Sequence, residues 1–300
     1  MLPRRKLLSA FTRQTWKARN PHLWTERLST AKLQPMRVPA PLSAALLIAS
    51  LLAVTLGPVS PAFAGRRAYT FTWDTETVNK GDIEIEQWLW SRALQPGAHL
   101  TSGWIWFAPV YGLTNHVELA IPWEVVVTPK GTQLADFTLE GRFRLYDPEK
   151  EDQFVRVLLR AAYTQNFANP DNAGLPPTTG WAALNAVVSL GDTKGTHGTI
   201  DVGGLADLHF GAKKLVRQTL GAGMTFKVSD EWRLGAEYYH QLQFGGAITA
   251  TFAGHDAHQF FAGPNVGFSR GRVWMTIGAL IGLNEAAPRV MPRFMLAVAI

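Results

Sequence analysis

The sequence predicts an all-β fold, a transmembrane antiparallel up-and-down β-barrel of about 12 strands. After residue 80 the chain consists of about a dozen segments of roughly ten residues, apolar on alternate positions, which is the side-chain period of a β-strand. The connections between these segments alternate between short and longer, and a cleavable export signal precedes them. The three features together favour a bacterial outer-membrane barrel over a soluble β-protein.

Residues 1–64 are predicted to be a leader that is removed on export. The apolar run from Leu42 to Leu56 is shorter than the roughly 20 residues of a helical membrane span. It is followed by Ala62-Phe63-Ala64, a small-x-small cleavage pattern, so we expect cleavage after Ala64. Met36 directly before the apolar run is a candidate for the true start, and an uncleaved N-terminal anchor is the alternative.

Charge and cysteine content exclude several classes of protein. The leader carries nine of the 29 Lys and Arg residues but only one of the 23 Asp and Glu residues, which leaves 20 basic and 22 acidic residues after it. A basic surface for nucleic acid is therefore not expected. The chain has no Cys, so it has no disulfides, no thiolate metal site and no cysteine for lipid attachment.

The remainder divides into two parts. Residues 65–80 are expected to be a periplasmic segment leading into the barrel, or an added strand, and residues 81–300 the barrel itself. Twelve strands place both ends of the barrel on the periplasmic side. The expected strands are residues 82–93, 99–109, 115–127, 132–146, 153–167, 180–191, 197–211, 215–228, 231–244, 257–269, 271–283 and 291–300.

Loop lengths agree with this count. If the first strand rises from the periplasm, every second connection is a periplasmic turn, and those connections are short: residues 112–114, 147–152, 192–196, 229–230 and the region of Gly271. The two longest connections, residues 168–179 and 245–256, then lie outside the cell. We therefore expect this orientation in the membrane.

The outward rows of the strands carry no charge, as expected for a surface in contact with lipid. These rows include Val155, Val157, Leu159, Ala161 and Tyr163; Ile200, Val202, Ala206 and Leu208; Leu220, Ala222, Met224 and Phe226; and Val273, Met275, Ile277, Ala279, Ile281 and Leu283. Aromatic residues near the segment ends are candidates for the two interfacial girdles: Trp104, Trp106, Tyr111, Trp123, Tyr146, Tyr163, Trp181, Trp232 and Trp274.

Three stretches carry a resemblance to known proteins. The last strand, with Phe294, Leu296, Val298 and Ile300 on one face, resembles the signal that the outer-membrane assembly machinery recognises, although Ile300 replaces the usual aromatic residue. Residues 74–88 and 111–119 resemble the first hairpins of transporter-like outer-membrane barrels such as the phenol-degradation MetA-type proteins. This resemblance implies a barrel concerned with passage of a small molecule, and it transfers no functional residue.

The inward positions carry the charged residues that we expect to line the lumen. The candidates for a solute path are Glu84, Glu86, Glu118, Glu140, Arg142, Arg144, Arg156, Arg160, Glu237 and Tyr239. Asp201, Asp207, Lys227, Arg233, Arg272 and Arg293 share this face, as do Gln241 and Gln243 beside Tyr239. These groups either pair across strands and fill the lumen, or form an aqueous path with an arginine ladder that attracts anions.

Two groups of residues near the expected extracellular loops are further candidate sites. A turn at residues 94–98 would set Ser91 opposite His99, as in a lipid-acting barrel enzyme, but no orienting Asp or Asn and no Gly-x-Ser-x-Gly is present. His255, Asp256 and His258 could hold a divalent ion, although a solvated polar loop is the simpler interpretation. We expect neither an enzyme nor a cofactor.

The sequence therefore predicts passive passage of a small solute through an outer-membrane barrel. The expected partners are outer-membrane lipids, the assembly machinery and the solute, and no nucleic acid. A plugged structural or surface-binding barrel is the first alternative, and a lipid-acting outer-membrane enzyme is the second.

Overall fold

The structure, a computed structural model, describes residues 67–91, 103–128, 131–146, 154–167, 180–191, 195–207, 215–245 and 258–300. All of them belong to one compact unit, Pro35–Ile300. Within these ranges no helix is long and apolar enough to span a membrane. The predicted leader, residues 1–64, lies outside the described residues.

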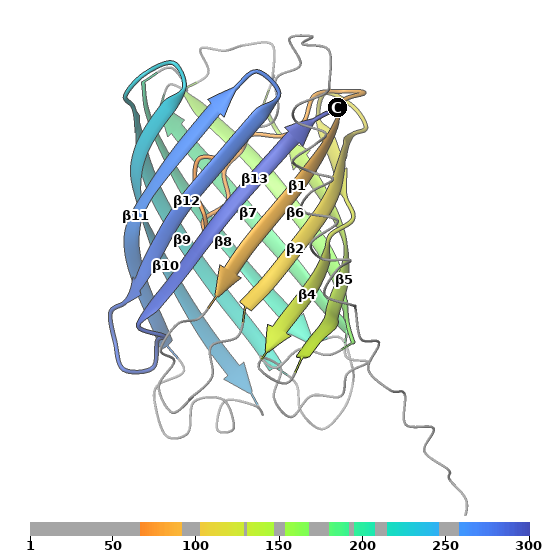
Figure 1. Cartoon of the computed structure of the whole chain (residues 1–300), viewed down its shortest axis with the longest axis vertical. Helices are drawn as coiled ribbons and strands as arrows, with labels where there is room; N and C mark the ends of the chain where they lie inside the picture. The colour runs from red at the N-terminus through yellow and green to blue at the C-terminus, as the bar shows by residue number, and fades with distance from the viewer. Residues whose placement is uncertain are drawn as a thin grey trace, which may run out of the picture. The chain divides into compact units, whose positions relative to one another are not determined.

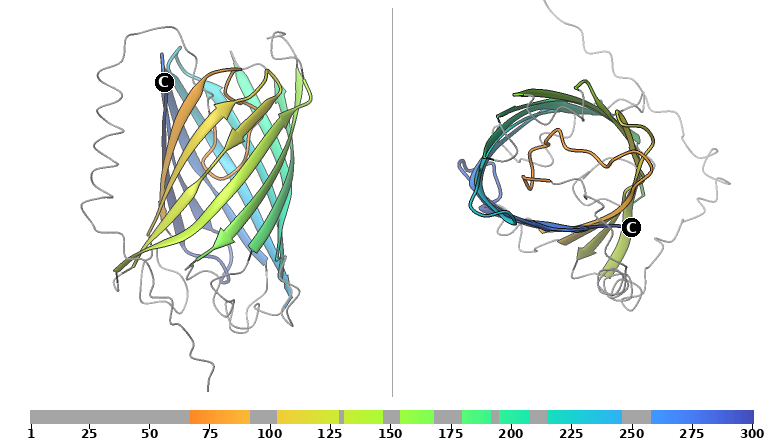
Figure 2. Two further views of the ribbon diagram at one scale, coloured as in Figure 1. Left: turned by 90° about the vertical axis from the view of Figure 1, so that its right-hand side faces the viewer. Right: turned by 90° about the horizontal axis from the view of Figure 1, so that it is seen from above.

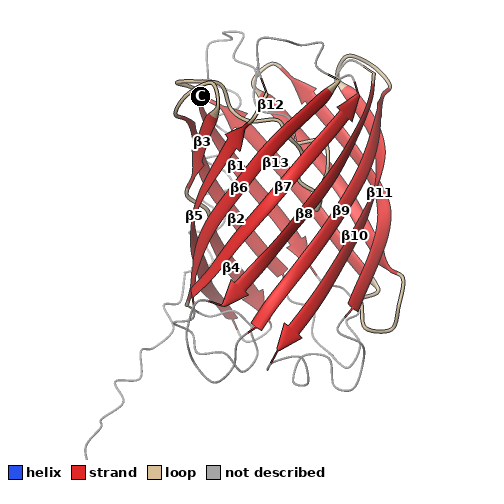
Figure 3. Cartoon of the chain, turned by 180° about the vertical axis from the view of Figure 1, so that it is seen from behind, coloured by secondary structure: helices blue, strands red, loops and turns tan. Residues whose placement is uncertain are grey.

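Thirteen strand segments form one antiparallel sheet (Figures 1 and 3). Their bounds are β1 (Ile83–Ser91), β2 (Gly103–Gly112), β3 (Val117–Ala120), β4 (Trp123–Thr128), β5 (Gly131–Arg144), β6 (Val155–Asn166), β7 (Gly180–Gly191), β8 (Thr196–Asp207), β9 (Leu215–Lys227), β10 (Trp232–Gly245), β11 (His258–Arg270), β12 (Val273–Gly282) and β13 (Val290–Ala299).

The sheet closes into a barrel of 12 strands. β3 and β4 both pair with β2 on one side and β5 on the other, so they are two halves of one barrel strand, interrupted at Ile121 and Pro122. Pro122 has no N–H to donate to a neighbouring strand, which accounts for a break at this point. β1 pairs with β2 and also with β13, which leaves the barrel without an edge. The predicted fold class is confirmed.

The connections also follow the predicted alternation. The described ends of β2, β5, β7, β9 and β11 lie at the same end of the barrel as Ile300, an end that we call the C-terminal rim. The described ends of β6 and β10, from which the two long connections start, lie at the opposite rim. Residues 168–179 and 246–257 themselves lie outside the described residues.

Residues 67–82 form no strand. Residues 67–78 lie inside the barrel, and we call them the lumen segment, whereas Asn79, Lys80 and Gly81 are exposed and lead into β1 at the C-terminal rim. The end-on view in Figure 2 shows this segment as an orange trace within the ring of strands. The sequence had placed residues 65–80 as a periplasmic segment or an added strand. The structure instead puts residues 67–78 in the lumen, where polar groups of Arg67, Thr70 and Glu76 bond with buried wall charges.

The aromatic girdle is smaller than the sequence suggested. Tyr111, Trp123, Tyr163 and Trp232 are exposed on the outer surface. Trp104, Trp181 and Trp274 are instead at most 2% exposed, Trp106 stacks on Trp88, and the Tyr146 hydroxyl donates to the Thr75 carbonyl in the lumen. Strand parity decides this, because Trp104 and Trp106 share the inward face of β2 with Ala108 and Val110.

Apolar clusters line part of the interior beside the charged residues. Trp88, Trp274, Met295 and Ala297 form an apolar cluster on β1, β12 and β13, and Trp73 of the lumen segment packs against it. A second cluster joins Val78 of the segment to Ala108, Val110 and Ala120. The same strands also carry charged residues that bond with the segment, such as Glu86 on β1 and Arg293 on β13.

Candidate functional site: the occupied lumen

The predicted lumen residues are placed inward by strand alternation. Glu84 and Glu86 on β1, Glu118 on β3 and Glu140 on β5 are each 1% exposed. Arg142, Arg144, Arg156 and Glu237 are also buried, and Arg160 is largely so. The Tyr239 ring lies between Phe71 of the lumen segment and Phe261, at 6.2 Å from each ring centre. Their role in a solute path stays a prediction.

Two arginines of the predicted ladder are neutralised by carboxylates. Arg142 donates to Glu140 Oε1 over 2.5 Å and also pairs with Glu118. Arg160 donates to Glu140 Oε2 over 2.5 Å and to the Asn185 side chain over 2.9 Å. Glu140 thus bridges the guanidinium groups of Arg142 and Arg160. Buried charges that pair in this way avoid the large cost of an isolated buried ion.

The lumen segment supplies a further cation to this network. Arg67 donates to Glu86 Oε1 from Nε over 2.9 Å and from Nη2 over 2.7 Å, and Glu118 lies 3.9 Å away. Burial by itself disfavours the charged form, but Glu86, Glu118 and Asp74 outweigh it and raise the pKa of Arg67 above its ordinary value. Arg67 is therefore a permanent positive charge between acidic wall residues.

Trp73 is the aromatic centre of the lumen segment. The guanidinium carbons of Arg67, Arg142 and Arg160 lie 4.7, 4.8 and 4.3 Å from its ring centre. Contacts of this kind between a cation and a ring face are attractive, more so away from water. The Thr199 hydroxyl donates to the Trp73 carbonyl, which ties the same residue to β8.

Glu237 on β10 binds the backbone of the lumen segment. Its carboxylate accepts hydrogen bonds from the N–H groups of Thr70, Phe71 and Thr72 over 2.6, 2.7 and 3.0 Å. The Thr70 hydroxyl and the Asn265 side chain donate to the same carboxylate. Three successive N–H groups around one anion form a backbone nest, so Glu237 holds the segment at the middle of its aromatic run.

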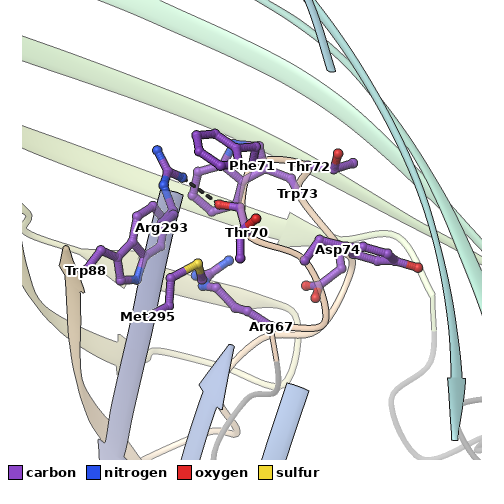
Figure 4. Close-up of a pocket in the computed structure, with 10 residues that line it drawn as sticks. Arg67, Thr70, Phe71, Thr72, Trp73, Asp74, Trp88, Arg293 and Met295 are labelled. Carbon is purple, nitrogen blue, oxygen red and sulfur yellow. Dashed lines mark hydrogen bonds between the residues drawn. The ribbon is translucent and has the colours of Figure 1, made fainter. Parts of the chain in front are cut away.

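A small cavity lies between the lumen segment and β13 (Figure 4). Arg67, Phe71, Trp88, Arg293 and Met295 are among its lining residues, and its volume is about 30 Å³. Arg293 donates to the Thr70 carbonyl over 2.6 Å, the dashed contact in Figure 4. Such a cavity has room for about one water molecule, so the segment fills this side of the lumen closely.

Asp74 is the buried acid of the lumen segment, and it is 2% exposed. Its carboxylate accepts the Ala68 N–H over 2.7 Å and the Glu76 N–H over 3.3 Å. Burial raises the pKa of this carboxyl to about 7, although the nearby Arg67 acts in the opposite direction. Asp74 therefore titrates near neutral pH, which gives the segment a pH-dependent contact.

The structure removes the geometric basis of the enzyme alternative. Ser91 at the end of β1 pairs with Gly103 of β2, so the expected position of Ser91 opposite His99 is wrong. The hairpin loop is longer than the turn we assumed, and His99 lies outside the described residues.

The proposed metal ligands are only partly described. His255 and Asp256 lie outside the described residues, and His258 Nδ1 lies 3.1 Å from His240 Nε2 on the neighbouring strand. In the described part of the chain, no three His, Cys, Asp or Glu side chains gather in a way that could hold a metal ion.

Sequence reasoning missed the residues of the lumen segment, chiefly Arg67, Tyr69, Trp73 and Asp74. One signal was available. Tyr69, Phe71 and Trp73 alternate with Thr70 and Thr72 in a stretch that the count of twelve strands leaves unused. Three aromatic residues at alternate positions are unusual for a solvated linker and indicate a buried contact.

Comparisons with known proteins agree with the fold. Comparison with protein-family models gave no match, and comparison with curated proteins gave none either. Among solved structures, the chain is similar to an outer-membrane channel from Pseudomonas putida F1, with a TM-score of 0.52 and 12% identity over 76% of this chain and 98% of that one.

Two further structures are more distant. The NanC porin gives a TM-score of 0.48 and 8% identity, over 73% of this chain and 98% of that one. Omp33 of Acinetobacter baumannii gives a TM-score of 0.38 and 10% identity, over 73% of this chain and 99% of that one. At these identities the likeness to the Pseudomonas channel establishes the fold of an outer-membrane β-barrel, and it supports the resemblance to MetA-type proteins only weakly.

Proposed function

We propose that this protein is an outer-membrane channel for passive passage of a small solute, with the lumen segment as the element that restricts the path. The observation that carries this proposal is that a peptide segment lies inside the ring of strands and bonds with wall residues of several strands. Barrels of eight strands are filled by their own side chains, whereas wider ones enclose additional space. Here that additional space is wide enough for a backbone with its side chains.

The membrane setting of this proposal follows from the surface of the barrel. Leu139, Leu159, Leu184 and Ile277 are among the exposed apolar side chains of the wall, and charged residues occupy the inward rows. We place the C-terminal rim in the periplasm, because the short turns lie there. Export to the outer membrane and handling by the assembly machinery belong to the same proposal, as do the lipid contacts.

The pattern of bonds in the lumen supports restricted passage over a permanent seal. Polar bonds to side chains, such as those from Glu237 and Arg293, hold much of the segment in place. Such bonds can be exchanged for bonds to water or to a polar solute, so each contributes only about 0.5–3 kcal/mol net. A segment held in this way can shift aside while the wall stays closed.

Single-channel recording in a planar bilayer tests the proposal. We expect small, discrete conductance steps from the wild-type barrel and larger ones from Glu237→Gln, which loosens the lumen segment. Current from Glu237→Gln alone would favour the alternative of a plugged structural barrel. No conductance from either protein would contradict the channel.

A further inference from the structure

Two neighbouring arginines near the C-terminal rim differ from the rest of the predicted ladder. Arg144 on β5 pairs with Leu158 on β6, and Arg156 lies two residues from Leu158 toward the same rim. Both side chains point into the lumen and are 5% and 7% exposed. The two residues therefore occupy diagonally adjacent positions on the inward face, away from bulk water.

The hydrogen bonds of these two arginines are incomplete. Arg156 Nη1 donates to Glu76 Oε1 over 2.6 Å, but its Nε and Nη2 find no acceptor. Arg144 Nη2 reaches the Val78 carbonyl at 3.4 Å, and its Nε likewise has no acceptor. A guanidinium carries five N–H donors and stays charged at every relevant pH. Several buried donors of the pair are thus unused.

The charge of the pair is also unbalanced. Within the described part of the chain, Glu76 is the one carboxylate that forms an ion pair with either arginine, and Arg144 has none. Arg142 and Arg160, farther from the rim on the same two strands, are both paired with Glu140. Water could satisfy the unused N–H groups, but it cannot neutralise a buried positive charge.

Further donors lie in the stretch of the lumen segment that the two arginines contact. Glu76 and Val78 are the residues that they bind, and Thr75 and Thr77 flank Glu76. The hydroxyl groups of Thr75 and Thr77 are buried without a hydrogen-bond partner. The Tyr146 hydroxyl, which lies close by, is already used by the Thr75 carbonyl.

We propose that Arg144 and Arg156, together with the hydroxyl groups of Thr75 and Thr77, bind a small oxyanion at the C-terminal rim of the lumen. The ligand chemistry is a carboxylate, phosphate or sulfate group, because its oxygen atoms accept parallel N–H donors from a guanidinium. This inference names the class of solute for the proposed channel. It rests on the proposed function only in so far as the bound oxyanion also passes through the barrel.

The test is calorimetric titration of the full-length mature barrel in detergent with sulfate, phosphate and acetate, each added separately. We expect saturable binding of at least one of them, and the one that binds most tightly identifies the oxyanion group. Arg144→Gln and Arg156→Gln should each weaken that binding roughly tenfold or more, because each removes charge-assisted hydrogen bonds. Arg270→Gln is the matched control, since it removes the same charge from the exposed turn at the same rim.

A variant in the lumen segment keeps the test decisive if a wall variant fails to fold. Glu76→Gln removes the carboxylate that competes for Arg156 and leaves every wall residue unchanged, so we expect tighter oxyanion binding. The proposal is overturned by absence of saturable binding, by equal binding in Arg144→Gln and Arg270→Gln, or by unchanged binding in Glu76→Gln. Binding without conductance would contradict the channel alone, and conductance without binding would contradict this site alone.

Discussion

At the scale of the residue, Glu237 attaches residues 70–72 of the lumen segment to β10. Its carboxylate accepts three backbone N–H groups, a hydroxyl and an amide. Glu237 lies on the inward face of β10, a strand whose side chains point alternately inward and outward. A residue expected to line a solute path therefore has a defined partner inside the protein.

Glu237→Gln should loosen the segment and leave the barrel intact. A carboxamide offers one acceptor oxygen and directs an NH₂ group at backbone donors, which we expect to weaken docking by about 2–3 kcal/mol. The chain has no cysteine, so Ala68→Cys gives a single buried thiol whose rate of modification by a maleimide reports undocking. The rate should rise on the order of 100-fold.

The control for this measurement is Glu231→Gln, which removes the same charge from a turn at the C-terminal rim. Equal modification rates in Glu237→Gln and Glu231→Gln would show that the carboxylate of Glu237 does not hold the segment. Heat-modifiable gel mobility shows that both barrels are folded.

Asp74 gives the docked segment a pH dependence. Burial raises the pKa of its carboxyl from 3.8 to about 7, so between these values the docked state binds more protons than the undocked state. Stability of docking therefore falls as pH rises from about 4 to about 7 and is constant above that range. Docking is most stable at low pH, where the Asp74 carboxyl is neutral in both the docked and the undocked state.

Deuterium uptake by residues 67–80 measures this effect. The measured quantity is the ratio of protection in the wild type to protection in Asp74→Asn at the same pH. This ratio should fall as pH rises from about 4 to about 7, because the variant cannot ionise at this position. The ratio cancels the intrinsic pH dependence of exchange. A ratio that stays constant with pH would contradict the assigned role of Asp74.

At the scale of the element, strand glycines make room for the lumen segment. A Cβ atom built on Gly223 of β9 would lie 2.3 Å from the Tyr69 ring, and one on Gly221 would lie 2.8 Å from the Thr72 side chain. From the sequence these two residues are ordinary strand glycines. Their place opposite the segment shows that wall and segment are complementary in shape.

Gly223→Ala should therefore displace Tyr69 without opening the wall. We expect docking to weaken by about 1–3 kcal/mol, the usual cost of overpacking, and modification of Ala68→Cys to accelerate accordingly. Gly141→Ala on β5 is the matched control, because its added Cβ would meet only the Leu119 side chain at 3.9 Å. If both alanine variants react at the same rate, the Tyr69 contact does not contribute to docking.

The strands themselves were predictable because their signal is local. Alternation places Val155, Leu159 and Tyr163 outward and Arg156 and Leu158 inward, as observed. The break at Pro122 and the bulge beside Glu124 were not predicted. The break has a local signal in Pro122, whereas the bulge depends on how β4 fits against β5, a relation that the sequence of β4 alone does not contain.

At the scale of the whole molecule, closure of the barrel creates the lumen and the charged and apolar surfaces that line it. β1 must meet β13 before Glu84 on β1 can accept the Trp274 indole N–H from β12. The same closure encloses the lumen segment, so its docking depends on strands from both halves of the chain. The occupied lumen is thus a property of the assembled barrel and not of any one strand.

The amino-acid sequence by itself determined the strand count, the alternation of short and long connections, the outward apolar rows and the inward position of the charged residues, because these depend on neighbours along the chain. Only the tertiary structure decided what the charged residues meet. Thr70 and Glu237 are 167 positions apart and Arg293 and Thr70 are 223 apart, so no local pattern connects them. The lumen segment occupies the centre because buried charges need partners, and barrel closure determines which partners lie within reach.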